Sequence, residues 1–212
     1  NFVKLSGNLI GFTGGKDSTL TLGILKDSGM KDNEVFTIHQ PTEHVRKVRE
    51  VLGVEDWKET VVIRKMDEEL IAKNKEGALN GHTPFSIVIG FVGLFIASLR
   101  GKEYVIVSNE ASANEPTVPG TDINHQYSKT FEFEKSFENY NKMVWPEGPS
   151  YFSILRPLSE VGIISLLKKY ESVMPYITSC NTISREKLWC GKCPKCLFSF
   201  LLFSAVWDIK FT

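Results

Sequence analysis

Residues 13–18, with the sequence TGGKDS, have the composition of a phosphate-binding loop. A phosphate group requires several backbone N–H donors directed at one point, and a glycine-rich turn between a strand and a helix N-terminus supplies them. The loop is not a Walker A motif, because Asp17 separates Lys16 from the serine. It is not a GxGxxG dinucleotide fingerprint either. We predict a site for phosphate groups here, with an ordinary Gly-Gly turn that starts a helix as the alternative.

The four cysteines of the chain form a second group that could do chemistry, and all of them lie between residues 180 and 196. Cys190, Cys193 and Cys196 have CxxC spacing, and Cys180 precedes them. Four thiolates can close a tetrahedral shell around Zn²⁺ with no open position, so the spacing predicts a structural zinc site. A redox CxxC pair and an iron–sulfur cluster are the alternatives. Cysteines clustered in this way do not form the disulfide framework of a secreted domain, which indicates an intracellular protein.

The elements that must position these groups alternate along the first half of the chain. Short runs rich in apolar and β-branched residues predict strands at 9–12, 35–39, 60–64 and 104–107. Apolar residues at helical spacing predict helices at 19–26, 43–52, 66–73 and 85–99. This alternation predicts an α/β fold, with a parallel sheet and helices on both of its faces.

The helix expected at 85–99 is unusually apolar. It is shorter than the roughly 20 residues that span a bilayer, and glycine and serine residues interrupt it. We therefore expect a buried helix between layers, with Thr83 as its N-cap and Pro84 in its first turn.

The second half of the chain is expected to hold a long polar loop at 111–122 and then three helices, at 127–140, 159–170 and 194–207. The first of these is rich in aromatic and acidic residues and is expected to pack on the sheet. The second should be capped by Ser159. We divide the chain into an α/β domain, residues 1–175, and a zinc-binding segment with a helix, residues 176–212, packed on that domain.

The composition excludes several classes of protein. The chain has 212 residues, of which 42% are hydrophobic and 24% charged, as in ordinary globular proteins. Lys and Arg number 25, and Asp and Glu also number 25, so the net charge of zero removes the bulk electrostatic reason to expect nucleic-acid binding. Residues 1–8 hold no apolar stretch of the secretory type, so we expect no signal peptide. We expect a cytoplasmic protein that acts on a small molecule, without nucleic-acid or membrane partners, and we expect this chain to be the core of a longer one.

The TGGKDS loop resembles the Ser-Gly-Gly-x-Asp-Ser loop of the PP-loop ATP pyrophosphatases. The resemblance implies a PP-loop fold, ATP and Mg²⁺, and a substrate that attacks the α-phosphorus with pyrophosphate as leaving group. It also implies a phosphate cradle with a counter-charge, made by Thr13, Gly14, Gly15, Lys16 and Ser18. Asp17 would organise Mg²⁺ and pyrophosphate, whose growing charge must be neutralised. His39 ends the second expected strand, where parallel sheets bind ligands, and is expected beside the adenine.

Short motifs spread over nearly the whole chain share a more specific resemblance. They are Asn80-Gly81-His82, Ser108-Asn109-Glu110, 124–129 (NHQYSK), 131–134 (FEFE), 155–160 (LRPLSE) and 179–181 (SCN). They resemble the UDP-N-acetylmuramoyl-L-alanyl-L-glutamate epimerases of peptidoglycan precursor synthesis. The resemblance implies that ATP adenylates the glutamate carboxylate, which removes the negative charge that resists carbanion formation at Cα. Inversion of Cα and hydrolysis would then release the D-glutamyl product, AMP and pyrophosphate.

Two other functions remain as alternatives. The 7-cyano-7-deazaguanine synthases share the N-terminal loop and a Cys…CGxCxxC zinc site, so a synthase of this type or another base-modifying PP-loop ligase is the first. A non-catalytic ATP-binding zinc scaffold is the second. Residues 124–134 match the epimerases and not the synthases, and the intact Lys16, Asp17 and Ser18 argue against a scaffold. A tRNA-thiolating enzyme with a catalytic cysteine is disfavoured, because the zinc site leaves no cysteine spare.

Proton transfer at the glutamate Cα requires groups whose pKa lies near 7 or is brought there by burial. His125, Tyr127 and Lys129 are the first candidates, because a loop leading into a helix lets donors and bases converge. Glu110 and His82 come next. Each of them could also have a purely structural role.

Substrate binding is assigned to three polar residues of the epimerase-like motifs, Asn109, Asn124 and Arg156. The guanidinium of Arg156 can grip a phosphate or a carboxylate in bidentate fashion, although an ordinary ion pair is the alternative. Glu132 and Glu134 are expected on a solvated helix face. The aromatic residues of the stretch 127–140 are expected mainly in the core.

Overall fold

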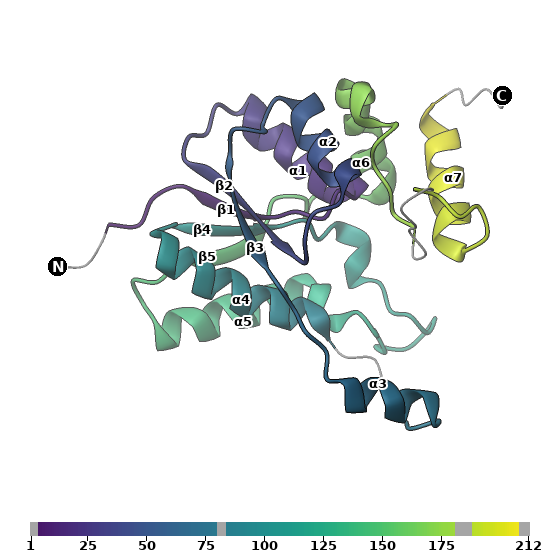
Figure 1. The fold of residues 1–212 in the computed structure, drawn as a ribbon, viewed down its shortest axis with the longest axis horizontal. Coiled ribbons are helices and arrows are strands. Elements are labelled where there is room, and N and C mark those ends of the chain that lie inside the picture. The colour runs from purple at the N-terminus through teal and green to yellow at the C-terminus, as the bar shows by residue number, and fades with distance from the viewer. Residues whose placement is uncertain (1–3, 80–83, 181–187, 208–212) are drawn as a thin grey trace.

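The computed structural model describes residues 4–79, 84–180 and 188–207. Within these residues the fold is built on a five-stranded sheet of order β3-β2-β1-β4-β5, in which all neighbouring strands are parallel (Figure 1). The strands are β1 (Asn8–Gly11), β2 (Asn33–Ile38), β3 (Lys58–Val62), β4 (Tyr104–Val107) and β5 (Ser150–Ser153). The predicted parallel α/β fold is confirmed.

The central strand β1 contributes to two separate cores. Ile10 belongs to a buried cluster with Leu20 and Ile163, whereas Leu9 belongs to another with Leu94. Successive side chains of a strand point to opposite faces, so the two clusters lie on opposite sides of the sheet. Leu9 and Ile10 are both 0% exposed, as expected for a parallel strand that is covered on both faces.

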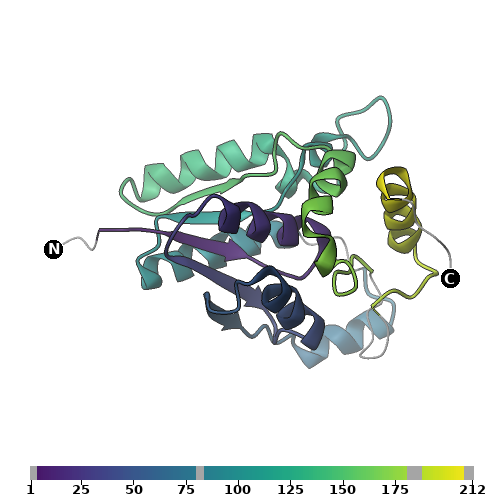
Figure 2. The ribbon, with the colours of Figure 1, turned by 90° about the horizontal axis from the view of Figure 1, so that it is seen from above.

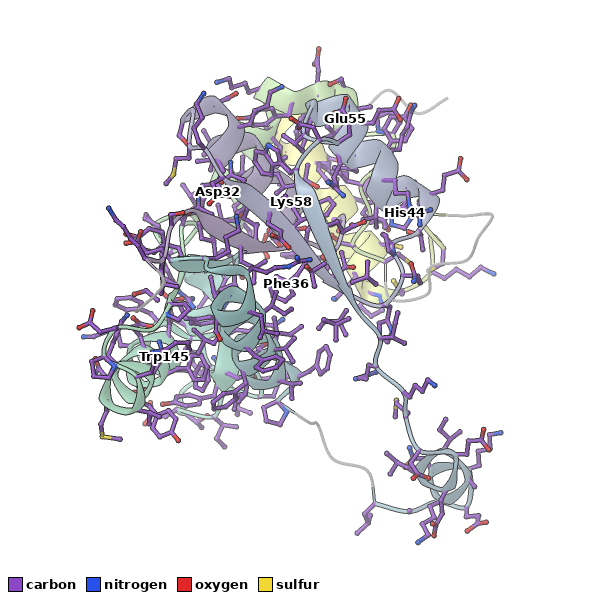
Figure 3. All side chains as sticks on the ribbon, turned by 60° about the vertical axis from the view of Figure 1, so that its left-hand side comes forward. Asp32, Phe36, His44, Glu55, Lys58 and Trp145 are labelled. Atoms are coloured by element: carbon purple, nitrogen blue, oxygen red, sulfur yellow. The ribbon has the colours of Figure 1, made fainter. Side chains whose placement is uncertain are left out.

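Two groups of helices cover the two faces of the sheet (Figure 1 and Figure 2). One face carries α1 (Lys16–Asp27), α2 (Glu43–Leu52) and α6 (Glu160–Leu167), and the other carries α4 (Phe85–Arg100) and α5 (Phe131–Val144). The C-terminal helix α7 (Pro194–Val206) adds Phe203 to the same core as Ile163 of α6. In contrast, α3 (Glu68–Lys75) projects away from the sheet and buries none of its residues (Figure 1 and Figure 3). Short 3-10 helices occupy Ala111–Asn114, Tyr127–Lys129 and Lys168–Val173.

The strands and helices predicted in the first half of the chain are confirmed, with ends shifted by a few residues. Strand β5 was not predicted. Its four residues, SYFS, carry too short a pattern to distinguish a strand from a loop. Pairing with β4, in which Phe152 lies opposite Ile106, makes this segment the edge of the sheet.

Helix starts agree with the sequence where a hydroxyl side chain caps them. Ser159 caps α6, as predicted, by accepting a hydrogen bond from the N–H of Gly162. The helix expected from residue 127 begins only after Thr130, which caps α5 in the same way. Pro84 is the N-cap of α4 and not a first-turn residue, and Thr83 lies outside the described residues.

The prediction that the apolar helix α4 is buried between layers is wrong. Its inner side approaches the sheet so closely that a Cβ on Gly93 would come within 2.7 Å of Val105. Its outer side is open, because Phe95 is 65% exposed and Leu99 is 69% exposed. The sequence is apolar around the whole helix, but only one side meets the sheet. No helix in the described part of the chain has the length and apolar character that crossing a membrane requires.

The aromatic residues of α5 and the turn before it are only partly in the core. Phe137 is buried, and its ring centroid lies 4.9 Å from that of Tyr151. The ring of Phe133 stacks on the ring of Phe137, with 5.5 Å between the two centroids. Tyr127 and Tyr140 are about half exposed, so the core prediction is wrong for them. The buried side of α5 thus includes Phe137, whereas the two tyrosines lie toward solvent.

Candidate functional site

A cavity of about 580 Å³ opens at the carboxyl ends of the central strands. Its lining includes Lys129, residues 37–40 at the end of β2 and residues 107–109 at the end of β4. The glycine loop contributes Thr13, Gly15, Asp17 and Ser18. Figure 3 marks two of its lining residues, Phe36 on the sheet and His44 near the start of α2. The chain runs from β1 to β2 on one side and returns to β4 on the other. The cavity therefore lies at the switch point where open α/β sheets bind ligands.

The glycine loop has the geometry of an anion cradle. Gly14 has a positive φ of +76°, and a Cβ there would come within 2.9 Å of a methyl group of Val45, so only glycine fits. Gly15 is the N-cap of α1 and makes no side-chain cap hydrogen bond. The first N–H groups of α1 are thus left for a ligand, and the helix dipole favours an anion there. The hydroxyl of Ser18 donates to the carbonyl of Gly15 at 3.2 Å and accepts from the N–H of Thr13 at 3.4 Å, which closes the loop.

Lys16 does not line this cavity, although Asp17 does. The Nζ of Lys16 lies 2.5 Å from Oδ1 of Asp17 and 2.5 Å from Oε2 of Glu160, the first residue of α6. The Lys16 side chain is only 6% exposed. The predicted counter-charge for phosphate is therefore held by two carboxylates of the protein.

Lys16, Asp17 and Glu160 shift one another's pKa values. Burial acts to lower the pKa of Lys16, but Asp17 and Glu160 outweigh it and hold the pKa above its usual value. Burial raises the pKa of Asp17 and of Glu160, and the attraction of Lys16 only partly opposes this. Two carboxylates that share one ammonium ion carry net negative charge next to the cavity, which a divalent cation such as Mg²⁺ at Asp17 would neutralise.

Of the five residues proposed for proton transfer, only Lys129 is among the residues that line this cavity, and Glu110 is close enough to act on the pKa of Lys129 and of Asp17. Lys129 lines the cavity, and its Nζ donates to Oε1 of Gln126 at 2.7 Å. Burial and the positive charge of Lys195 lower the pKa of Lys129, and Glu110 and Asp17 act in the opposite direction. A partly buried lysine with a lowered pKa is a stronger candidate for a base than an exposed one.

The other proton-transfer candidates lie elsewhere. His125 lines a second hollow, of about 490 Å³, between the loop 112–126, the start of α6 and α7, and its Nδ1 lies 2.5 Å from the hydroxyl of Thr117. Tyr127 is exposed and makes an edge contact with Phe133. His82 lies outside the described residues. The expected convergence of His125, Tyr127 and Lys129 is therefore not observed.

The residues proposed to bind adenine and substrate are also divided. His39 and Asn109 line the cavity. His39 has a φ of +93°, and its N–H donates to the carbonyl of Val62 at 2.7 Å, which turns the chain sharply after β2. Asn124 lines the second hollow, where its side chain donates to the carbonyl of Ala113 and accepts from the N–H of Gln126, so it shapes the loop.

Arg156 is not among the residues that line the cavity and is committed to an internal ion pair. Its Nη2 lies 2.8 Å from Oε2 of Glu134, and further hydrogen bonds reach the carbonyls of Glu110 and Thr130. The expectation that Glu134 lies on a solvated face is wrong, because it is only 5% exposed. Its partner lies more than 20 positions away in the sequence, so local spacing could not reveal the pair.

Arg156→Ala is expected to lower the free energy of unfolding by about 3–5 kcal/mol, because it leaves the buried carboxylate of Glu134 without a counter-charge. Chemical denaturation measures the change. In the matched control Lys73→Ala, which breaks the exposed pair with Glu69, the loss should stay within about 1 kcal/mol. An equal, small loss in both variants would contradict the structural role of Arg156.

Two residues of the site were missed by the sequence reasoning. Glu160 lies in a quoted motif and follows the helix cap Ser159, but only the fold brings it to Lys16. His44 lines the cavity from α2, and burial lowers its pKa. Its position in the first turn of a helix that follows a strand was the available signal.

The four cysteines come together as predicted. Their Sγ atoms all lie within 4.8 Å of one another, with separations of 3.9 Å for Cys180 and Cys193, 3.8 Å for Cys190 and Cys196, and 3.5 Å for Cys193 and Cys196. A tetrahedron with metal–sulfur bonds of about 2.3 Å has edges of about 3.8 Å. The donor set therefore fits one metal ion, whereas an iron–sulfur cluster, whose own atoms must lie between the thiolates, requires them farther apart.

Thr178 connects the cysteine cluster to the glycine loop. Its backbone N–H donates to the carbonyl of Gly14 at 3.3 Å. Its hydroxyl accepts from the N–H of Cys180 at 3.2 Å and donates to the carbonyl of Leu188 at 2.6 Å. The position of the glycine loop thus depends on the segment that carries the cysteines.

Comparisons with known proteins bear on this arrangement. Residues 3–154 match the family described as the MurL N-terminal domain. The chain is 35% identical to the UDP-N-acetyl-alpha-D-muramoyl-L-alanyl-L-glutamate epimerase of Xanthomonas oryzae pv. oryzae, over 91% of this chain and 44% of that protein. It is 33% identical to the epimerases of the same name from a Micromonospora species and from Salinispora tropica, over 89% of this chain and 42% and 41% of those proteins. The chain thus spans less than half the length of these curated relatives.

A solved structure supports the fold alone. The U34-tRNA thiolase NcsA from Methanococcus maripaludis, determined with its [4Fe-4S] cluster, superposes with a TM-score of 0.52 at 12% identity. The match covers 99% of this chain and 75% of that one. The sheet and its helices therefore have the same fold as that thiolase.

Proposed function

Because this chain belongs to the MurL epimerase family, we propose that it supplies the ATP site of an enzyme that inverts the terminal L-glutamate of UDP-MurNAc-L-Ala-L-Glu. The reaction would take place in the cytoplasm, during synthesis of the peptidoglycan precursor. The observation that carries the proposal is the cavity in which the glycine loop, Asp17 and Lys129 meet. The matched relatives are longer than this chain, so the complete activity is proposed for the full-length protein.

The loop and the start of α1 would bind the phosphates. The N–H groups of the first helical turn and of the glycine loop would bind the β- and γ-phosphates, and Asp17 would hold Mg²⁺ beside them. When the substrate carboxylate attacks the α-phosphorus, these groups neutralise the charge that grows on the departing pyrophosphate. His39, at the end of β2, would lie beside the adenine.

Lys129 is the proton-transfer group that we favour. It lies in the same cavity as the glycine loop, and burial lowers its pKa, which increases the neutral fraction that can accept a proton. Inversion requires a donor on the opposite face of Cα, and Glu110, which is electrostatically coupled to Lys129, is the second candidate. His125 would act, if at all, from the second hollow.

We propose Zn²⁺ as the ion of the cysteine site, in a structural role. Four thiolates leave no position open for water or substrate, and the separations between sulfur atoms fit a single tetrahedral ion. The division of the chain into residues 1–175 and 176–212 remains part of this proposal.

The test is deuterium incorporation by the full-length protein. Incubation with UDP-MurNAc-L-Ala-L-Glu, ATP and Mg²⁺ in D₂O is expected to place one deuterium at the glutamate Cα and to release AMP and pyrophosphate, and omission of ATP should prevent both. Lys129→Met is expected to retain AMP formation and to lose deuterium exchange, because adenylation precedes proton transfer. No exchange by the wild-type protein would eliminate the epimerase proposal, and exchange by Lys129→Met at the wild-type rate would eliminate Lys129 as the base.

A further inference from the structure

Glu160 reaches the glycine loop from another part of the fold. It is the first residue of α6, and its Oε2 lies 2.5 Å from Nζ of Lys16, which in turn lies 2.5 Å from Oδ1 of Asp17. The exposed fractions of the three side chains are 20% for Glu160, 6% for Lys16 and 32% for Asp17. Only Asp17 of the three lines the cavity, whereas Glu160 lines the second hollow. The ammonium group of Lys16 is therefore held between a carboxylate that lines the cavity and a carboxylate that lines the second hollow.

We propose that Glu160 is a positioning residue that holds Lys16 out of the cavity and thereby keeps Asp17 directed at the phosphates and their cation. The inference rests on the proposed ATP chemistry of the cavity. It assigns Glu160 a contribution to the rate without direct contact with substrate.

The position of Lys16 explains why such a residue is needed. Lys16 is the first residue of α1, and the dipole at a helix N-terminus favours anions and repels cations. The flexible side chain of Lys16 lets its ammonium group move toward the nearest strong negative charge. With Glu160 present, its partly buried carboxylate holds the ammonium group in one place, and α6 itself begins at the cap formed by Ser159.

Without Glu160, Lys16 would keep only Asp17 as a partner and would turn with it toward the cavity. There it would compete with Mg²⁺ for Asp17 and would bind the phosphates of ATP before reaction. A contact made equally in the ground state and in the transition state improves binding of ATP and does not accelerate the reaction. Loss of Glu160 should therefore lower kcat while the KM for ATP stays the same or falls.

The experiment uses Glu160→Gln in the full-length protein. The kcat of substrate-dependent AMP formation is expected to fall about 10- to 100-fold, as for residues that orient a ligand of a bound cation, with no increase in the KM for ATP. Glu160→Asp, which keeps the charge on a shorter side chain, should recover part of the rate. As a readout independent of activity, Lys16 should be acetylated by an amine-reactive reagent faster in Glu160→Gln than in the wild type, as measured by mass spectrometry.

The matched control is Glu68→Gln. Glu68 is also the first residue of an eight-residue helix, but no residue of α3 is among those that line the cavity, so kinetics and Lys16 labelling should match those of the wild type. If Glu160→Gln keeps both its kcat and the protection of Lys16 and only melts at a lower temperature, Glu160 merely stabilises α6 and the inference is wrong. A raised KM with unchanged kcat would also overturn it. A wild-type protein that forms no AMP at all would overturn the proposed function, and the labelling of Lys16 would still report on the contact with Glu160.

Discussion

Asp17→Asn in the full-length protein is expected to form AMP and pyrophosphate at least about 100-fold more slowly than the wild type, the size of loss seen when one group that stabilises a developing charge is removed. Asp17 is the carboxylate of the glycine loop that reaches the cavity wall, so it is the group able to hold Mg²⁺ beside the phosphates. A neutral amide in its place neither holds the cation nor offsets its charge. A coupled assay of pyrophosphate release measures the change.

The same substitution should leave the fold intact. Burial already disfavours the charged form of Asp17, as its raised pKa indicates, and the amide oxygen of asparagine can still accept from Lys16. The melting temperature should therefore change little. Asp56→Asn, at an exposed position in the turn before β3, provides the matched control and should keep the wild-type rate. Pyrophosphate release by Asp17→Asn at the control rate would contradict the role given to the loop.

Loss of the metal ion from the cysteine site is expected to destabilise the protein strongly. Structural zinc sites contribute apparent binding energies of about 10–16 kcal/mol, so Cys193→Ser, which removes one of the four thiolates, should lower the free energy of unfolding by several kcal/mol. Elemental analysis should find about one zinc per chain in the wild type and little in the variant. Differential scanning fluorimetry of the wild type, with and without a chelator, measures how much the melting temperature falls when the metal is removed.

Loss of the metal should also weaken ATP binding, because Thr178 joins the cysteine segment to the glycine loop. Because Thr178 donates to Gly14 and accepts from the N–H of Cys180, a loosened cysteine segment should also loosen the glycine loop. The chelated wild type is therefore expected to bind ATP more weakly, and added zinc should restore binding in the wild type but not in Cys193→Ser. Iron absorption in the visible range, or a stable protein without metal, would contradict the zinc assignment.

The fold was predictable to the extent that its elements carry local patterns. The runs at β1, β2 and β4, and the amphipathic α2, were located from apolar spacing alone, because each must bury a recognisable face. β5 was missed since four residues do not form a pattern, and its pairing with β4 is a contact between distant segments. The open face of α4 could not be predicted, because apolar composition indicates that a face can be buried and not whether anything covers it.

The candidate site also has parts that the sequence predicted and parts that only the structure revealed. The sequence alone determined the glycine loop and the four-cysteine cluster, because their members are neighbours along the chain and their residue types limit the chemistry to an anion and a metal ion. Only the tertiary structure paired Lys16 with Glu160 and Arg156 with Glu134, and only it separated His125 from Lys129. The direction of a charged side chain depends on which opposite charge the fold brings within about 4 Å, because the attraction between two charges weakens as their distance grows. Sequence spacing does not encode such distances between separate elements, so the partners of these charges became visible only once the sheet had brought the helices together.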